Sequence, residues 1–148
     1  MPAIVTLDDV RYVVDENLMG LGNGMVALRR DTARFSLAPV DALLPAGILD
    51  PDWIPIVGDR GWVLITVDRR LRTRPYEATL AVRHKLKVVH LHGTIANKPP
   101  WAQMVRLATR WPSIENHVNR SPEGPWWFSV RRGGVTEMRF MPGSAERA

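Results

Sequence analysis

The sequence predicts an α/β fold in three layers, with a mainly parallel central sheet and a C-terminal β-hairpin. Short apolar runs alternate with longer stretches of helical character, which is the pattern of parallel strands joined by helical crossovers. Two of these runs, at 62–66 and 87–91, are almost continuously apolar, as in strands that are buried on both faces of a sheet. A glycine pair, Gly133 and Gly134, separates the last two runs and indicates a hairpin turn.

The first part of the chain predicts two strands and one helix. Residues 11–15 contain a tyrosine and two valines and end on an acid, which indicates a first buried strand. A helical stretch follows over 18–30, although glycines weaken its first turns. Residues 35–41 predict a short second strand, and Pro39 limits it to an edge or irregular position.

The clearest helix start in the sequence is at Asp50. This acid suits the N-cap position, and Pro51 suits the first helical position. Trp53 begins an apolar stripe with helical spacing, and Gly61 ends the helix. The apolar run at 62–66 follows directly and predicts a central strand.

The second half of the chain predicts two more helices, a strand between them and the hairpin. The predicted helices, strand and hairpin strands lie at about 74–85 and 100–118, at 87–91, and at 126–130 and 135–140. We expect residues 1–140 to form a single domain. The tail at 141–148 is expected to be disordered.

The composition is that of a globular protein. With 148 residues, 45% of them hydrophobic and 24% charged, the chain is long enough to bury one core. It has no cysteine, which excludes disulfides and thiolate metal sites. No apolar run is long enough to span a bilayer, and the N-terminus lacks the pattern of a secretory signal. These features predict a soluble, cytoplasmic protein that does not bind a membrane.

The net charge of +5 is distributed unevenly along the chain. Residues 1–68 hold 5 Lys or Arg and 10 Asp or Glu, whereas residues 69–148 hold 15 and 5. An acidic half joined to a basic half fits a metal site beside a surface that binds a polyanion. The alternative is that the basic residues only solvate helix faces.

Acidic residues gather where parallel sheets bind their ligands. Asp15 follows the first predicted strand and Asp68 follows the central one, so both are expected at the carboxyl edge of the sheet. The N-termini of the connecting helices reach the same edge. They bring three further acids to it, Asp50, Asp52 and Glu77. A cluster of oxygen ligands suits Mg²⁺ or Mn²⁺, which clamp phosphate oxygens and activate water.

Each acid also has a structural interpretation. Asp50 can act as a helix cap only. Asp52 and Glu77 can serve only to complement the dipoles of their helices. Asp15 and Asp68 favour a functional interpretation more strongly, because a carboxylate that closes a buried strand is costly without a partner.

Arginine, histidine and tryptophan side chains are further candidates for binding. Four arginines come directly after Asp68, namely Arg69, Arg70, Arg72 and Arg74, and their guanidinium groups are suited to holding RNA phosphates. His90 and His92 share one strand face and either bind a metal or line the sheet end. Trp126 and Trp127 either stack bases or pack in the core or at a protein interface.

Two short segments resemble the PIN-like domain family, and the VapC-type toxins within it. The segments are Val-Val-Asp-Glu-Asn-Leu at 13–18 and Gly-Trp-Val-Leu-Ile-Thr-Val-Asp at 61–68. The family has Asp-x-Asn after its first strand and Thr-x-Asp after a later one. The matching residues here are Asp15 and Asn17, with Glu16 between them, and Thr66 and Asp68.

The resemblance extends to an acid that opens the helix before the later strand. Asp50 matches it by its distance from Trp53, and Asp52 is the other candidate. A basic stretch that ends in Pro-x-Glu, at 70–77, is also similar to this branch. The resemblance covers roughly residues 12–91.

The resemblance implies a PIN-like fold and a Mg²⁺- or Mn²⁺-dependent endoribonuclease that acts as the toxin of a toxin–antitoxin pair. It implies that Asp15, Asp50 and Asp68 are catalytic, with Asp52 as a further metal ligand. The implied partners are RNA and a cognate antitoxin protein, and a homodimer is also expected.

The sequence departs from the family pattern after the Thr-x-Asp motif. Many PIN nucleases have a further acid shortly after it, whereas Arg69 and Arg70 occupy the next two positions here. Glu77 is the remaining candidate for that acid. This departure leaves a second hypothesis open, a PIN-like module with a weakened site that binds RNA or a protein partner without catalysis.

Overall fold

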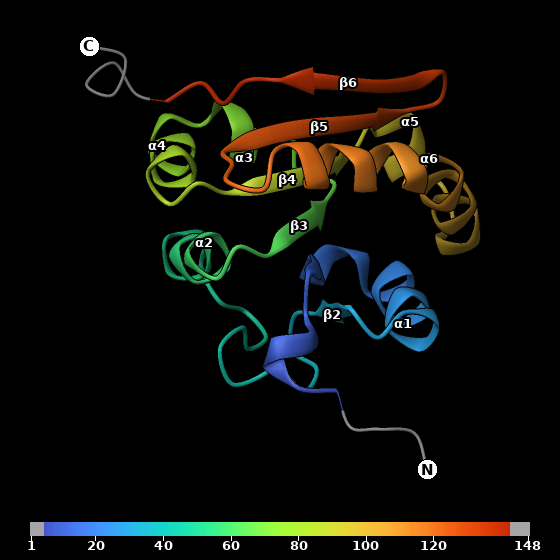
Figure 1. Ribbon diagram of the computed structural model, residues 1–148, viewed down its shortest axis with the longest axis horizontal. Helices are drawn as coiled ribbons and strands as arrows, with labels where there is room; N and C mark the ends of the chain where they lie inside the picture. Colours follow the sequence, from blue (N-terminus) through green and yellow to red (C-terminus); the bar gives the residue numbers. More distant parts are fainter. Residues whose placement is uncertain (1–4, 143–148) are drawn as a thin grey trace.

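A six-stranded sheet forms the centre of the computed structural model, which describes residues 5–142 (Figure 1). The strand order is β2-β1-β3-β4-β5-β6. Neighbouring strands run parallel from β2 to β5, and β6 runs antiparallel to β5. The strands are β1 (Tyr12–Val14), β2 (Thr32–Arg34), β3 (Val63–Thr66), β4 (Lys87–Leu91), β5 (Trp126–Arg131) and β6 (Gly134–Met138).

Helices cover both faces of the sheet and complete the three layers that the sequence predicts (Figure 1). The four longer helices are α1 (Met19–Leu28), α2 (Asp50–Asp59), α4 (Pro75–Arg83) and α6 (Pro100–Arg120). Helices α2 and α4 lie against one face, and α1 and α6 lie against the other. The short helices are α3 (Arg70–Thr73), α5 (Gly93–Ala96) and the 3₁₀ turns Leu7–Asp9 and Glu16–Leu18.

The two faces of the sheet form two separate cores because side chains alternate along each strand. Leu64 of β3 packs with the buried residues of α2 and α4. Its neighbours Val63 and Ile65 pack with those of α1 and α6. Both faces of the central strands are therefore apolar, which explains the near-continuous apolar runs in the sequence.

The strand order creates a crevice between the ends of β1 and β3. The chain leaves β1 through α1 toward β2 on one face, and returns through α2 to β3 on the other. The two strands lie side by side at this reversal, with Val14 paired to Ile65. Open α/β sheets bind their ligands outside the carboxyl ends of the strands at such a point.

Most of the predicted elements are confirmed to within a few residues, but the second strand is wrong. The prediction placed it at 35–41, whereas β2 spans Thr32–Arg34 and turns follow it. Ser36 has a positive φ of 64°, which an extended strand does not allow. Phe35 is apolar because it is a core residue, buried to 1% exposure at the start of these turns.

The start of α2 is also shifted from its prediction. Leu49 is the N-cap residue, so Asp50 is the first helical residue, and the predicted capping role of Asp50 is wrong. The short helices α3 and α5 were not predicted. Of the tail predicted to be disordered, residues 143–148 lie outside the described residues. No helix within residues 5–142 is both long and apolar enough to cross a membrane.

Candidate active site

Asp15 and Asp68 meet at the crevice between β1 and β3, and the Thr66 hydroxyl links them. The backbone N–H of Asp15 donates to the Ile65 carbonyl at 2.9 Å, which continues the β1–β3 pairing beyond the strand. The Thr66 hydroxyl donates to Oδ2 of Asp15 at 2.7 Å. It also accepts from the backbone N–H of Asp68 at 3.1 Å. The Thr-x-Asp spacing thus places one hydroxyl between the two acids.

These residues line a small pocket of about 140 Å³, which we call the acidic pocket. Its polar lining consists of Asp15, Glu16, Asn17, Asp50, Thr66 and Asp68, and Trp53 is among its apolar residues. The three acids with predicted catalytic roles therefore lie together, although they are up to 53 positions apart in the chain. The fold thus brings these three acids together at one edge of the sheet, as the strand ends and the helix start predict.

The acids of the pocket differ in what holds them. One oxygen of Asp50 accepts from the Trp53 indole N–H at 2.8 Å. Both oxygens of Glu16 accept from the backbone N–H of Gly47, at 3.0 and 3.2 Å, so Glu16 anchors the loop before α2. Oδ1 of Asp68 accepts from the backbone N–H of Arg70 at 3.0 Å. Glu16 thus has a structural role, whereas Asp15, Asp50 and Asp68 line the pocket with one carboxylate each.

Burial and mutual repulsion act on the ionisation of Asp15. Burial raises the pKa of the Asp15 carboxyl above its ordinary value. Hydrogen bonds from Thr66 and from the backbone of Glu16 and Asn17 lower this pKa, and the negative charge of Asp68 raises it again. A carboxylate in this position gains from a nearby cation, because a positive charge favours its ionised form.

Two of the predicted site acids do not line the acidic pocket. Asp52 is exposed in the first turn of α2. It lies two residues after Asp50, roughly 200° further around the helix, and therefore points away from the pocket. Glu77 lies in the first turn of α4, and the short helix α3 separates it from Asp68 along the chain. The expectation that these two join the cluster is not met.

The acidic pocket offers only oxygen ligands to a cation. In the described part of the chain, no group of three or more His, Cys, Asp or Glu side chains is arranged to hold a metal ion. Mg²⁺ is commonly bound by one or two carboxylates, with water filling its other positions. Asp15 and Asp68 are a donor set of that kind, with Asp50 on the same pocket wall.

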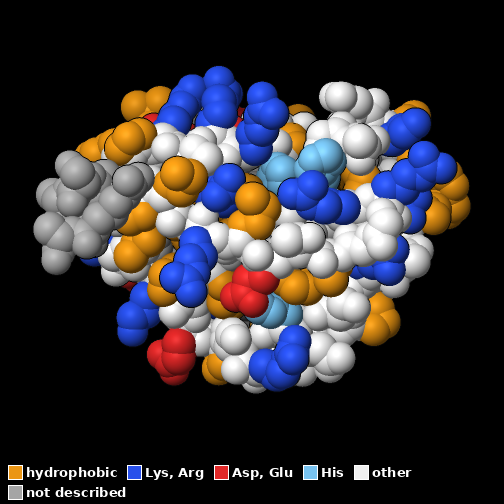
Figure 2. All heavy atoms as spheres, turned by 90° about the horizontal axis from the view of Figure 1, so that it is seen from above, with side chains coloured by type: hydrophobic (Ala, Val, Ile, Leu, Met, Phe, Trp, Pro, Cys, Tyr) orange, Lys and Arg blue, Asp and Glu red, His pale blue; other side chains and the backbone are white. Residues whose placement is uncertain are grey.

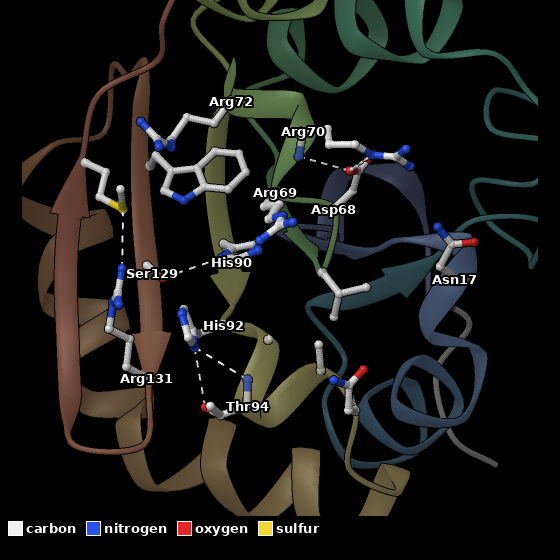
Figure 3. A pocket seen from close by; sticks show the side chains of 16 residues that line it. Asn17, Asp68, Arg69, Arg70, Arg72, His90, His92, Thr94, Ser129 and Arg131 are labelled. Atoms are coloured by element: carbon white, nitrogen blue, oxygen red, sulfur yellow. Dashed lines mark hydrogen bonds and ion pairs between the residues drawn. The ribbon is translucent and has the colours of Figure 1, made fainter. Parts of the chain in front are cut away.

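A larger cleft of about 990 Å³ adjoins the acidic pocket, and we call it the basic cleft (Figure 3). Asn17 and Asp68 line both cavities. Its charged and histidine lining consists of Asp68, Arg69, Arg70, Arg72, Arg131, His90 and His92. On the face seen in Figure 2, Lys and Arg side chains surround histidines and acidic side chains are few. Acids from the acidic half of the sequence therefore line one cavity, and arginines from the basic half line the cavity beside it.

The four arginines predicted to bind RNA have different surroundings. Arg69, Arg70 and Arg72 line the basic cleft, whereas Arg74 is exposed and lines neither cavity. Arg70 forms an ion pair with Asp68 at 3.4 Å, so it holds the acid in place. Arg72 donates to the backbone carbonyl of Arg139 at 2.9 Å and ties α3 to the end of the hairpin.

The histidines and tryptophans divide between the cleft and the core. His90 lies in the cleft lining, and its ring is tilted by 34° against that of Trp127, with ring centroids 4.9 Å apart. Trp126 and Trp127 are 4% and 1% exposed, so they pack in the core and cannot stack bases as they stand. Ser129, a cleft residue that sequence reasoning missed, is paired with His90 across β4 and β5. Its place beside His90 depends on strand register, which the sequence does not specify.

Replacing Thr66 with valine is expected to destabilise the metal-free protein by about 1.5–3 kcal/mol at pH 7, because a partly buried carboxylate loses its hydroxyl donor. The pKa of Asp15 is already above its ordinary value, and the loss of this donor raises it further. Protonation of Asp15 removes the need for the donor, so the loss of stability should shrink as the pH falls toward 4. Thermal unfolding at both pH values measures this.

Thr136→Val is the matched control for this variant, because Thr136 is exposed on β6 of the same sheet. It should change stability by less than about 0.5 kcal/mol at either pH. A Thr66→Val protein that loses equal stability at pH 4 and pH 7 would show that its hydroxyl does not act on the Asp15 charge.

Comparison with known proteins gives one family. The sequence profile of a family described as a PIN like domain matches residues 10–93, which is more than half of the chain. The match includes β1 to β4 and all of the acids that line the acidic pocket, and it ends before α6 and the β5–β6 hairpin. Comparisons with curated proteins and with solved structures give no match.

Proposed function

Because the chain belongs to the PIN-like domain family, whose fold is in general a nuclease fold, we propose that it is a metal-dependent endoribonuclease. The observation that carries this proposal is the acidic pocket beside the basic cleft. Asp15 and Asp68 lie at the reversal of strand order, linked by Thr66, where an α/β sheet binds its ligand. The cleft that shares Asp68 offers arginines to a polyanion.

The proposed cofactor is Mg²⁺ or Mn²⁺, held by Asp15 and Asp68 with help from Asp50. The hard oxygen donors of the pocket and the repulsion between Asp15 and Asp68 support this choice. Such an ion supplies charge stabilisation for phosphate oxygens and a more reactive water. Asn17, which lines both cavities, is suited to orient Asp15 or a water by hydrogen bonding.

Other side chains of the protein are suited to binding the RNA and to positioning the acids of the pocket. Arg69 and Arg72 reach the cleft and are suited to holding RNA phosphates. Arg70 fixes the Asp68 carboxylate through its backbone N–H and its guanidinium, and so positions an acid of the pocket. Trp53 does the same for Asp50.

We place this activity in a toxin of a toxin–antitoxin pair that acts on cellular RNA in the cytoplasm. An exposed apolar strip on α6 supports a protein partner such as an antitoxin or a second copy of the chain. Trp101 is 76% exposed and Val105 is 48% exposed, one helical turn apart. Exposed aromatic and aliphatic side chains at this spacing are typical of protein interfaces.

A second candidate function is RNA or protein binding without catalysis. It is favoured by the arginines that follow Asp68, one of which already pairs with that acid. A nuclease and a binding module make opposite predictions for the acids of the pocket, because only catalysis depends on their charge.

The experiment that separates the two functions compares Asp50→Asn with Asp52→Asn. Both acids lie in the first turn of α2, so both variants lose the same interaction with the helix dipole. Only Asp50 lines the pocket, and asparagine keeps an oxygen for the Trp53 indole. RNA cleavage with Mg²⁺ should slow by about tenfold or more in Asp50→Asn, equivalent to about 1.4 kcal/mol.

Cleavage by Asp52→Asn should stay within about twofold of the wild type. Equal cleavage rates in the two variants would remove Asp50 from the proposed site. A wild-type protein that binds RNA but cuts none would favour the binding module.

A further inference from the structure

Polar side chains form a row across the carboxyl end of the sheet, from the acidic pocket to the hairpin. Thr66 of β3 is paired with His90 of β4, and His90 is paired with Ser129 of β5. All three are at most 5% exposed. Side chains paired across parallel strands point to the same face, so the row continues the Thr66–Asp15 contact toward β5.

A second row lies two residues further along the chain, just beyond the ends of β3 and β4 and at the end of β5. Asp68, His92 and Arg131 follow Thr66, His90 and Ser129 at this spacing, and all three line the basic cleft. The cleft thus has the acidic pocket at one end and Arg131 at the other, with His92 between them (Figure 3).

Arg131 has few partners for a half-buried guanidinium. Its Nε atom is buried and has no hydrogen-bond partner among the described residues. Its NH2 group lies 3.7 Å from the sulfur of Met138, which is a weak acceptor. No carboxylate in the described part of the chain forms an ion pair with it, whereas Arg70 in the same cleft is paired with Asp68.

The surroundings of Arg131 favour an anion. Asp68 is the one acid among the described residues that line the cleft, and it already forms an ion pair with Arg70. Burial lowers the pKa of His90 to about 4; the charges of His92 and Arg131 add to this effect, while a hydrogen bond with the Val67 backbone and the charge of Asp68 oppose it. A partly desolvated arginine beside further basic groups gains most from a phosphate, which accepts two hydrogen bonds from one guanidinium.

We infer that Arg131 and His92 form a second phosphate-binding position, which holds the backbone of a single-stranded RNA on the hairpin side of the acidic pocket. The inference rests on the proposed function for the identity of the polyanion. A positively charged groove that tracks the backbone is typical of single-strand binding. The cleft volume of about 990 Å³ is at the upper end of ligand pockets, so more than one nucleotide fits.

The Arg131 side of this position belongs to the C-terminal part of the chain, whereas His92 lies within the matched residues. Arg131 and the wall that carries it belong to β5 and β6, beyond the residues that match the PIN-like family. The hairpin therefore adds a substrate-binding wall to a nuclease core. The hairpin extends the cleft away from Asp68 and would help to hold the RNA strand beside the acidic pocket.

The test compares Arg131→Gln with Arg132→Gln in binding to a single-stranded RNA oligonucleotide, in EDTA so that no cleavage occurs. The two residues are adjacent and the variants lose the same charge, but Arg132 is exposed and does not line the cleft. We expect Arg131→Gln to weaken binding by about tenfold and to reduce the salt slope by about 0.7, the value for one phosphate contact on a single strand. Arg132→Gln should stay within about twofold of the wild type.

Two further variants guard against a folding defect. Arg131→Lys keeps the charge but not the paired hydrogen bonds, so it should recover part of the affinity, and His92→Gln should weaken binding by about threefold. Circular dichroism of each variant checks that the fold is retained. Equal RNA affinities of folded Arg131→Gln and Arg132→Gln would overturn the inference.

The binding assay tests this inference and the cleavage assay tests the proposed function, and their results are independent of each other. A wild type that binds RNA through Arg131 but cuts none would support this inference and overturn the proposed nuclease. A wild type that ignores RNA but binds poly-glutamate through Arg131 would overturn the inference in favour of an acidic protein partner.

Discussion

Asp68→Asn is expected to abolish RNA cleavage while making the metal-free protein more stable. Asparagine keeps an oxygen for the backbone N–H of Arg70, so the local hydrogen bond survives. The substitution removes the negative charge that raises the pKa of Asp15, and thus relieves repulsion in the pocket. The Arg70 side chain is 64% exposed, so its ion pair with Asp68 contributes little to stability and the loss of this pair does not offset the gain.

The expected loss of cleavage is at least about a hundredfold, because metal stabilisation of phosphate charge contributes several kcal/mol. The melting temperature of the metal-free variant should rise by about 1–3 °C. Mn²⁺ should raise the melting temperature of the wild type by mass action and leave that of the variant nearly unchanged. Thermal unfolding with and without Mn²⁺ measures both effects.

Asp52→Asn is the control, because Asp52 is exposed and lies outside the pocket. It should respond to Mn²⁺ like the wild type. If Asp68→Asn is less stable than the wild type without metal and still cuts RNA, Asp68 has a structural role and the metal site is wrong.

Trp127→Ala is expected to have the largest effect on stability. Trp127 is 1% exposed, and its ring contacts His90 at 4.9 Å and Phe140 at 5.7 Å between centroids. Truncation of a buried tryptophan costs about 3–5 kcal/mol, which includes the cavity it leaves. For a chain of this length the melting temperature should fall by about 10 °C or more.

The cavity of Trp127→Ala would open beside His90, so the cleft wall should loosen as well. RNA affinity, measured at a temperature where the variant is still folded, should fall by several fold. Trp101→Ala is the control, because Trp101 is 76% exposed and should lose less than about 0.5 kcal/mol. Equal stability losses in the two variants would contradict the buried position of Trp127.

The fold was predictable from the sequence where the pattern is set by burial on both faces. The apolar runs of β3 and β4 identify them as central strands, and prolines mark the starts of α2 and α6. The segment at 35–41 was wrongly predicted as a strand, because Phe35 lies in a turn although its side chain is buried in the core. Apolar composition alone does not separate a strand residue from a turn residue that is anchored in the core.

The sequence predicted the part of the candidate site that lies directly after the ends of strands. Asp15 and Asp68 follow β1 and β3, and the parallel sheet brings the two ends together. The hairpin side of the cleft was not predictable, because the contact of His90 with Ser129 depends on the register of β4 and β5. No tight turn joins β4 and β5, because α5 and α6 lie between them, so turn geometry does not fix their register.

Cleavage of an end-labelled RNA by the purified wild type shows whether the acidic pocket cuts RNA with a divalent cation. We expect internal cleavage with Mg²⁺ or Mn²⁺, none in excess EDTA, and full recovery when the metal is restored. Equal cleavage with metal and with EDTA would contradict a metal-dependent nuclease, and so would RNA that stays intact under all conditions while the protein binds it.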